Sequence, residues 1–407
     1  MSAWRGQCFF DPFGEANMTS YDVIVVGVGG MGSAACWQLA RRRKRVLGIE
    51  RYDIPNAMGS SHGVNRIIRL AYFEHPSYVP ILRRAYELWR ETETLAGEQL
   101  LHVTGSMDIG QEGSDIVQKS LESCRLHSLS HELLTASEVA SRYPGYALPA
   151  NYMALYQEDG GFVASERAIV AAAKLALNAG ASLRARESFV DFEPIAGGGV
   201  RVRTDRATYE TGQLVIAAGA WVGELVPMLK SLAVPERQVL GWFRPKIPKL
   251  FEPGAFPVSN LKSDVGHFYQ FPEWNVPGFK IGLYHHFKEH GPADGLSREP
   301  TSADEDALRR GLAAFFPAAD GDILALRTCM FTNTPDEHFI LDRLAECPEV
   351  IVASPCSGHG FKFASAIGEI LADLATEGAS KFDLSLFALD RMSLAKSRDF
   401  AQSAQGA

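Results

Sequence analysis

The chain has 407 residues, of which 46% are hydrophobic and 22% are charged, and its 40 basic and 48 acidic residues give a net charge of −8. This composition excludes a disordered or collagen-like chain, and at about 150 residues per domain the length indicates two or three domains. The acidic balance argues against nucleic acid as a partner, because a negative surface repels phosphate backbones. No apolar run approaches the ~18 residues that a membrane-spanning helix requires, so no membrane partner is expected.

The cysteines and the first residues indicate where the protein works. Six cysteines are scattered along the chain without CxxC spacing or the density of a disulfide framework, which favours a reducing compartment. Residues 1–20 contain one arginine and no continuous apolar core, so we expect a flexible lead and not a signal peptide, with Met18 as an alternative start. A cytoplasmic location is therefore expected.

The first ordered unit is an apolar strand followed by a glycine-rich turn. Residues 22–26 (DVIVV) have the β-branched character of a strand that is buried on both faces. The turn GVGGMG follows at 27–32, a helical pattern covers 33–43, and RVLGIE at 45–50 has the pattern of a second strand. This order of strand, turn, helix and strand is the context in which a GxGxxG motif predicts dinucleotide binding.

Each glycine of this motif has its own physical role. Gly27 permits the tight turn, Gly29 lets the backbone approach a pyrophosphate, and Gly32 lets the helix pack close to the strand. The start of the helix then offers free N–H groups to the phosphates. Glu50 stands where an acid accepts hydrogen bonds from the adenosine ribose, and a carboxylate there disfavours a 2′-phosphate. FAD or NAD is therefore favoured over NADP.

The later elements continue this pattern. Helical patterns cover 78–98, 165–179 with Ser165 as N-cap, and 364–376. The apolar strand and turn LVIAAGAW at 214–221 is of the kind that returns beneath the cofactor in flavoproteins, which favours FAD over NAD. From 230 to 290, β-branched and aromatic runs broken by proline and glycine predict an antiparallel sheet, and the residues after 380 form a tail that packs or frays.

These elements predict an α/β fold with two domains, the second inserted into the first. A Rossmann-type FAD-binding domain is expected to comprise residues 21–100, 160–225 and 320–385. A β-rich substrate domain is expected to comprise residues 101–159 and 226–319.

Four segments together resemble the monomeric sarcosine oxidase and N-methyltryptophan oxidase family of flavoenzymes. They are YDVIVVGVGGMG at 21–32, GSSHGVNRIIRLAY at 59–72, CMFTNTPDEHF at 329–339 and SGHGFKF at 357–363. The resemblance covers about residues 20–392 and implies a two-domain fold like that of glycine oxidase and the DAO enzymes. It also implies a monomer that uses FAD, an amino-acid substrate and molecular oxygen.

By this resemblance, Cys329 matches the cysteine that tethers FAD covalently through the flavin 8-methyl carbon. Oxidised flavin can lose a methyl proton and leave an electrophilic carbon that a thiolate attacks. The family usually has tyrosine where Phe331 stands, so one hydroxyl near the substrate is missing here. The resemblance therefore implies covalent FAD in a pocket of altered polarity.

The resemblance also assigns three cations. Arg69 and Lys362 match the pair that holds the substrate carboxylate beside the cofactor, where arginine supplies a rigid fork of donors and lysine a point charge. Lys280, in GFKIG at 278–282, matches the lysine that lies over the flavin and activates oxygen. A fixed ammonium there stabilises the superoxide formed when reduced flavin passes its first electron to oxygen.

Other positions that line flavin or substrate in the family match His62, Arg66, Tyr269 and His359. The turn Gly358–Gly360 directs backbone N–H groups toward the flavin's pyrimidine oxygens. After Ile281 the chain reads GLYHH, one residue longer than the sarcosine oxidase pattern, so the active-site position falls to either His285 or His286. No metal site is expected, because the three possible ligands at 336–338 are consecutive and seldom converge on one ion.

The expected reaction is the oxidation of an N-methyl amino acid to an imine, which water hydrolyses to formaldehyde and the demethylated amino acid while oxygen becomes hydrogen peroxide. An oxidase of a cyclic or larger secondary amine, such as pipecolate or a glycated amino acid, is the alternative within this fold. A flavin dehydrogenase that passes electrons to a carrier and a non-enzymatic flavoprotein scaffold remain alternatives of other classes.

Overall fold

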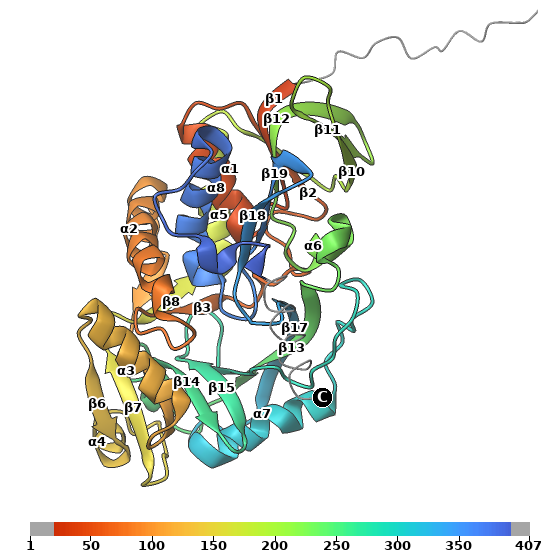
Figure 1. The fold of residues 1–407 in the computed structure, drawn as a ribbon. Helices are drawn as coiled ribbons and strands as arrows, with labels where there is room; N and C mark the ends of the chain where they lie inside the picture. The colour runs from red at the N-terminus through yellow and green to blue at the C-terminus, as the bar shows by residue number, and fades with distance from the viewer. Residues whose placement is uncertain (1–19, 392–407) are drawn as a thin grey trace, which may run out of the picture.

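The structure is a computed structural model in which residues 20–391 are described. Ser20 already belongs to the first strand, so the expected flexible lead and the alternative start at Met18 lie outside the described residues. Two large sheets divide the molecule into an upper and a lower half in the view of Figure 1. Among the described residues, no helix is both long and apolar enough to cross a membrane.

The first sheet has eight strands, ordered β10-β11-β12-β1-β2-β9, with β19 beside β12 and β18 beside β19. Its strands are β1 (Ser20–Val26), β2 (Val46–Glu50), β9 (Ser182–Ala185), β10 (Phe189–Pro194), β11 (Val200–Thr204), β12 (Thr208–Ile216), β18 (Ile340–Leu344) and β19 (Cys347–Ser354). Strand β1 runs parallel to both β2 and β12, which is the arrangement of a dinucleotide-binding sheet. The α/β fold expected for this half is confirmed.

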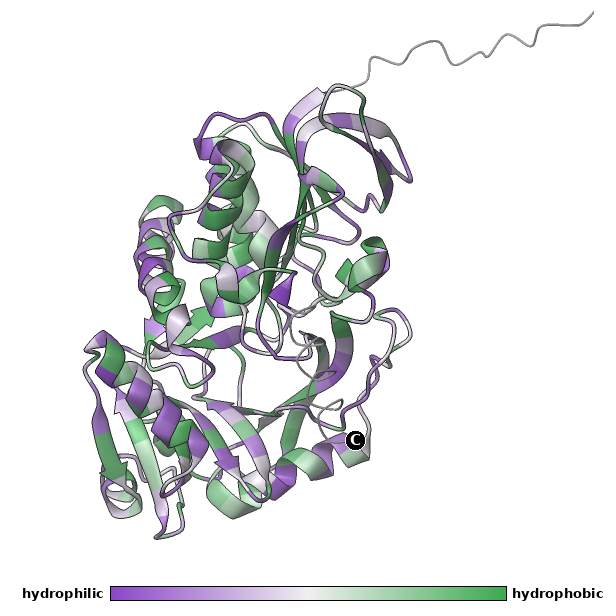
Figure 2. Cartoon of the chain, viewed as in Figure 1, coloured by the Kyte–Doolittle hydropathy of each residue, from purple (hydrophilic) through white to green (hydrophobic). Residues whose placement is uncertain are grey.

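Four helices cover one face of this sheet: α1 (Gly30–Arg41), α2 (Val79–Ala96), α5 (Ser165–Asn178) and α8 (Ala364–Glu377). Val23 and Val25 of β1 pack toward the helices, while Ile24 and Val26 pack on the opposite face, so the strand is buried on both sides as predicted. The sheet strands behind α1, α5 and α8 are mainly hydrophobic, whereas α2 alternates hydrophilic and hydrophobic bands (Figure 2).

The predicted N-cap of α5 is wrong. Ala164 occupies the N-cap position, and no side chain caps the helix there. Ser165 is the first helical residue, and its hydroxyl donates a hydrogen bond to the carboxylate of Glu166 (2.8 Å) in place of accepting one from the helix.

The second sheet has eight strands in the order β17-β13-β16-β15-β14-β5-β7-β6. They are β5 (Ser106–Gln111), β6 (Glu132–Thr135), β7 (Tyr152–Gln157), β13 (Val234–Phe243), β14 (Val258–Ser263), β15 (Gly266–Phe271), β16 (Phe279–Leu283) and β17 (Ile323–Asn333). The pairs within β13–β16 are antiparallel, as predicted, whereas β14 pairs with β5 in parallel. Helix α7 (Ser302–Phe315) packs on this sheet over a core rich in phenylalanine.

A small sheet of β3 (Asn65–Ile68), β8 (Gly161–Ala164) and β4 (Leu101–Val103) lies between the two large ones. The remaining helices are α3 (Asp115–His127), α4 (Ala136–Arg142), α6 (Val222–Leu225) and the 3₁₀ turns η1 (Pro76–Tyr78), η2 (Gly219–Trp221), η3 (Pro227–Leu229), η4 (Pro248–Phe251), η5 (Phe361–Phe363) and η6 (Ser385–Phe387). The predicted tail packs as far as it is described, because Phe387 is buried against Tyr78 and Phe339.

Two edges of the predicted domain division differ from the sheet topology. Strand β17 falls in the segment 320–385 expected in the FAD-binding domain, but it pairs with β13 over its whole length and so belongs to the second sheet. Strand β4 falls in the segment 101–159 expected in the substrate domain, but it pairs with β8 in the small sheet. Long-range strand pairing decides both assignments, and the local pattern of a strand does not reveal its partner.

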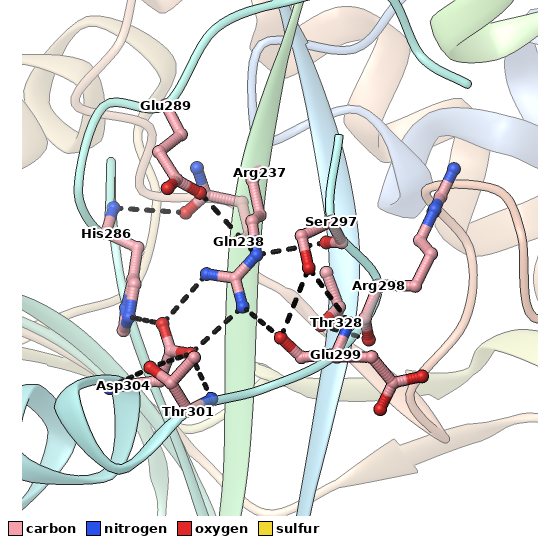
Figure 3. Close-up of polar contacts among 10 residues, drawn as sticks. All are labelled: Arg237, Gln238, His286, Glu289, Ser297, Arg298, Glu299, Thr301, Asp304 and Thr328. Atoms are coloured by element: carbon pink, nitrogen blue, oxygen red, sulfur yellow. Dashed lines mark hydrogen bonds and ion pairs between the residues drawn. The ribbon is translucent and has the colours of Figure 1, made fainter. Parts of the chain in front are cut away.

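A long connection between β16 and α7 is anchored at both ends by one buried arginine (Figure 3). Arg237 of β13 donates from Nη1 and Nη2 to the two oxygens of Asp304 (2.8 and 2.9 Å) at the start of α7. It also donates to the carbonyls of Ser297 and Glu299 (3.0 Å each). His286, at the other end of the connection, lies 2.8 Å from Asp304 through Nε2.

Candidate active site

A cavity of about 360 Å³ runs from the glycine turn after β1 to the aromatic face of the second sheet. Ten of the residues expected to bind cofactor or substrate line it: Gly27, Gly29, Glu50, Arg66, Arg69, Tyr269, Cys329, Gly358, His359 and Lys362. These residues come from strands and turns far apart in the sequence, and the fold brings them to one surface. The other three, Gly32, His62 and Lys280, are not among the residues that line the cavity.

The geometry of the glycine turn fits a dinucleotide. Gly27 has φ +88°, and a Cβ there would lie 2.5 Å from the carbonyl oxygen of Ala217. A Cβ on Gly32 would lie 1.7 Å from the Gly27 carbonyl oxygen, so α1 approaches β1 more closely than any side chain allows. Gly29 faces open space, which leaves the start of α1 accessible to a phosphate.

Glu50 is held in place at the end of β2. Its Oε2 accepts a hydrogen bond from the backbone N–H of Val28 (2.9 Å), and its Oε1 accepts one from that of Tyr52 (2.9 Å). Burial raises the pKa of this carboxyl, while these N–H donors oppose the rise. The carboxylate lines the cavity beside the glycine turn, where a ribose of a bound dinucleotide can reach it.

Cys329 lies on β17 in the wall of the cavity and is 2% exposed. Burial raises the pKa of its thiol, and the positive charges of Arg66, Lys280 and Arg298 oppose that rise. Nearby cations favour the thiolate form of a buried cysteine, whereas apolar surroundings disfavour it. Phe331, two residues further on, also lines the cavity.

Arg69 and Lys362 both lie close to the ring of Tyr72. The Arg69 Cζ lies 4.6 Å and the Lys362 Nζ lies 5.3 Å from the ring centroid of Tyr72. Burial lowers the pKa of Lys362 to about 7, and its Nζ donates to the carbonyl oxygen of His359 (2.7 Å). Both side chains line the cavity, so two cations face the same space.

Two carboxylates neutralise Arg69 in this structure. Its Nη2 donates to both oxygens of Glu74 (3.0 and 2.9 Å), and its Nε lies 3.5 Å from Oδ1 of Asp108. Asp108 is fixed on β5, where it also accepts hydrogen bonds from Ser120 Oγ (2.7 Å) and Asn260 Nδ2 (2.9 Å). Glu74 lies on the loop after Arg69 and lines the cavity, so it occupies the place where a ligand carboxylate would bind the guanidinium.

His359 is neutral and oriented by its neighbours. Burial lowers its pKa to about 4. Its Nε2 lies 2.9 Å from the carbonyl oxygen of Glu337, which can only accept, so Nε2 carries the hydrogen. Nδ1 then accepts from the Tyr72 hydroxyl (2.7 Å). The ring therefore acts as a fixed wall beside Arg69 and Lys362 and is a poor base near neutral pH.

Neither His285 nor His286 lines the cavity. His285 lies 2.8 Å from Glu236 and 3.1 Å from Glu337, and these carboxylates raise its pKa to about 9, while His286 pairs with Asp304. Tyr284, the residue before them, lines the cavity instead. The sequence interpretation missed Tyr284, Glu74, Asp108 and Asn260. Only the position of Glu74, five residues after Arg69, offered a local signal.

Comparisons with known proteins identify the family of the chain. A family model described as "FAD dependent oxidoreductase" (DAO) matches residues 22–374. The chain is 39% identical over 384 residues to monomeric sarcosine oxidase of Streptomyces avermitilis, covering 92% of this chain and 99% of that one. It is 33% identical over 378 residues to N-methyl-L-tryptophan oxidase of Yersinia pestis, covering 91% and 99%.

Solved structures confirm the predicted two-domain architecture. NikD, described as an unusual amino acid oxidase essential for nikkomycin biosynthesis, superimposes with a TM-score of 0.77 at 28% identity, covering 91% of this chain and 97% of that one. L-proline dehydrogenase from P. horikoshii has the same fold, with a TM-score of 0.81 at 22% identity over 93% and 99% of the chains. The chain is thus a member of the DAO family of FAD-dependent oxidoreductases, homologous to the monomeric sarcosine oxidases and N-methyltryptophan oxidases.

Proposed function

We propose that this protein is an FAD-dependent oxidase of N-methyl amino acids, which it converts to formaldehyde, the demethylated amino acid and hydrogen peroxide. The observation that carries the proposal is the pair Arg69 and Lys362, two buried cations that face one cavity beside the Tyr72 ring. Two such cations suit a carboxylate, which arginine binds with two parallel hydrogen bonds. The homologous oxidases, named for sarcosine and N-methyl-L-tryptophan, support the N-methyl amino acid as substrate.

The residues present fit FAD. Gly27 and Gly29 leave room for the pyrophosphate, Glu50 lies where the ribose is expected, and the Gly358–Gly360 turn borders the remainder of the cavity. FAD supplies the redox chemistry when bound: it accepts a hydride equivalent from the amine carbon and passes the electrons to oxygen. The protein contributes orientation, charge and exclusion of water.

The substrate carboxylate would replace Glu74 as the partner of the Arg69 guanidinium. Asp108 stays in place, because β5, Ser120 and Asn260 hold it. The Lys362 ammonium adds a second charge, and the neutral ring of His359 borders the same space. This arrangement would fix the carboxylate end of the substrate inside the cavity.

We include in the proposal that Cys329 bonds covalently to FAD. The thiol sulfur would bond the flavin 8-methyl carbon, and the thiol hydrogen and one methyl hydrogen would leave with two electrons to oxygen as hydrogen peroxide. The buried position of Cys329 in the cavity wall supports this assignment. Acid precipitation tests it, since a yellow pellet is expected and a colourless pellet from yellow holoenzyme would contradict it.

Lys280 is proposed to assist oxygen through its charge. Its Nζ lies 4.1 Å from the ring centroid of Phe271, which lines the cavity. All three ammonium hydrogens are donated to backbone and side-chain oxygens of residues 63 and 65. The ammonium therefore cannot donate to superoxide without breaking one of these bonds, and its effect on a reduced oxygen species would be electrostatic.

The experiment that tests the function is peroxide release from the purified holoenzyme with sarcosine and N-methyl-L-tryptophan in parallel. Peroxide with either amine supports the proposal, and the preferred amine reports the size of the pocket. Flavin bleaching under nitrogen without peroxide in air would identify a dehydrogenase. Bleaching by neither amine, but by pipecolate or a glycated amino acid, would replace the proposed substrate class.

We further propose that the protein works as a monomer in the cytoplasm. The names of the homologous monomeric sarcosine oxidases support the monomer. The scattered cysteines support the location. Sedimentation of the holoenzyme at a single-chain mass is the expected result, and a dimer mass at micromolar concentration would contradict it.

A further inference from the structure

The turn at His62–Asn65 adopts a backbone conformation that its sequence disfavours. Gly63 has φ +107°, and a Cβ there would lie 2.4 Å from Leu240 Cδ1. Val64 has φ +75°, which is rare and strained for a β-branched residue. A strained turn persists only where surrounding contacts over-determine it, and such turns cluster at functional sites.

Charged side chains hold this turn from two sides. Glu166, at the start of α5, accepts hydrogen bonds from the backbone N–H groups of Gly63 (2.8 Å) and Val64 (3.0 Å). From the other side, Lys280 Nζ donates to the carbonyl oxygens of Gly63 (2.7 Å) and Asn65 (2.9 Å). The peptide between Gly63 and Val64 thus has an anion at its N–H and a cation at its carbonyl, so both charges favour the same orientation of this peptide dipole.

Two further contacts of the turn concern groups already assigned to the flavin site. Arg66 lines the cavity and donates to the carbonyl oxygens of His62 and Asn65, and His62 Nδ1 lies 3.2 Å from Glu166 Oε1. The Val64 side chain packs on the cluster that contains Cys329. The turn therefore connects Glu166 to the thiol and to a cation beside it.

We propose that Glu166 is a positioning residue of the flavin site, which holds the strained His62–Asn65 turn so that Val64 stays packed on the cluster that contains Cys329 and so that Arg66 and Lys280 stay aligned beside that cluster. The inference rests on the proposed function only for the chemistry of Cys329. The resemblance to known oxidases assigned no role to Glu166. The side chain reaches the turn because Ser165 Oγ donates to its Oε2 (2.8 Å) and leaves both oxygens directed at the two N–H groups.

Two substitutions of Glu166 separate the effect of its side-chain length from the effect of its charge. Glu166→Asp keeps the charge but is one methylene too short to reach both N–H groups. Glu166→Gln keeps the reach, since its oxygen can accept from Gly63 and Val64 and its NH₂ can donate to Ser165 Oγ. The matched control is Glu98→Gln. It removes a half-buried carboxylate that pairs with Arg167, the residue that follows Glu166 in α5.

The first measurement uses chains in which Cys329→Ser prevents covalent attachment. We expect Glu166→Asp to weaken FAD binding at least tenfold, measured by flavin fluorescence titration, and Glu166→Gln to stay within threefold of the parent. Glu98→Gln is expected to equal the parent. FAD affinity of Glu166→Asp within twofold of the parent, at an unchanged visible flavin spectrum, would overturn the proposal.

The second measurement uses chains that keep Cys329 and follows the rate at which FAD becomes covalent. Glu166→Asp is expected to slow attachment at least tenfold at a melting temperature that matches Glu166→Gln, whereas a purely structural role would lower the melting temperature and leave the rate of the folded fraction unchanged. If the parent chain attaches no FAD, the proposed covalent linkage fails, and the titration above still decides the role of Glu166.

Discussion

Two clusters of buried charge in this protein differ in how completely the hydrogen bonds of their arginine are satisfied. Arg237, 4% exposed, donates to both oxygens of Asp304 and to two backbone carbonyls, and His286 adds a further contact to the same carboxylate (Figure 3). Arg69, 3% exposed, is bound by Glu74, but its Nε has no hydrogen-bond partner among the described residues. Only the second cluster borders the large cavity.

The difference shows that a buried charge can stabilise the fold, as at Arg237, or can be available to a ligand, as at Arg69 and Lys362. The Asp304 carboxylate is fully engaged, and the arginine beside it keeps its pKa well below the usual range. Lys362, by contrast, has its pKa lowered to about 7, because burial penalises its charge more than its surroundings compensate it. A buried cation whose charge is poorly compensated, as at Lys362, can gain free energy from an incoming anion, whereas an arginine whose donors are all occupied has little left to offer a ligand.

The largest effect, a loss of stability, is expected when the hydrogen bonds between Arg237 and Asp304 are removed. Asp304→Ala leaves the buried Arg237 guanidinium without its anion, which should lower the free energy of unfolding by about 3–5 kcal/mol. Urea unfolding measures this loss. Asp322→Ala is the control, since Asp322 is exposed and only 3.5 Å from Arg244, so its removal should have little effect. An equal decrease in the free energy of unfolding in the two variants would show that the buried pair stabilises the protein no more than the exposed one.

Next in size is the loss of the carboxylate-binding arginine. Arg69→Ala should raise the KM for the amino-acid substrate roughly 100-fold, because truncating one partner of a buried charge pair costs about 2–5 kcal/mol. Steady-state peroxide release measures KM. Arg244→Ala, an exposed arginine, should leave it unchanged. An unchanged KM in Arg69→Ala would remove this residue from the carboxylate site.

A comparable effect on a different step is expected for Lys280. Lys280→Met should slow reoxidation of the reduced flavin by roughly 100-fold, the size found when one charge-stabilising donor is removed. Flavin reduction should slow much less, since reduction does not involve oxygen. Stopped-flow absorbance separates the two half-reactions. Equal slowing of reduction and reoxidation would mean that Lys280 only holds the His62–Asn65 turn in place.

The smallest effect concerns the pH dependence of anion binding. Because the pKa of Lys362 is lowered to about 7, the ammonium is lost as pH rises through 7, and the dissociation constant for a carboxylate such as propionate should rise by up to about tenfold per pH unit above that point. Perturbation of the flavin spectrum by propionate measures it. Lys362→Gln should bind more weakly with no dependence on pH in this range, and a sloping profile in that variant would point to another group.

Local patterns predicted an element well where its conformation depends only on a few consecutive residues. The glycine turn at 27–32 is legible because left-handed φ angles and close helix packing are properties of a few consecutive residues. The Ser165 cap was wrong because a neighbouring carboxylate, Glu166, uses its hydroxyl. The choice between His285 and His286 could not be made from spacing, since the chain turns at His285 (φ +54°) and presents Tyr284 to the cavity instead.

The amino-acid sequence by itself determined the strand–turn–helix unit for a dinucleotide, the two-domain α/β class and, through four motifs, the family of the protein. The tertiary structure alone decided which sheet β17 joins. It also decided that Glu74 and Asp108 pair with Arg69. The hydrogen bonds from Glu166 and Lys280 to one strained turn are likewise visible only in the folded chain. The physical reason is the distance along the chain over which each interaction acts. Backbone propensity and hydrophobic period act between near neighbours, whereas the strength of a buried charge depends on groups that folding brings together from distant parts of the chain.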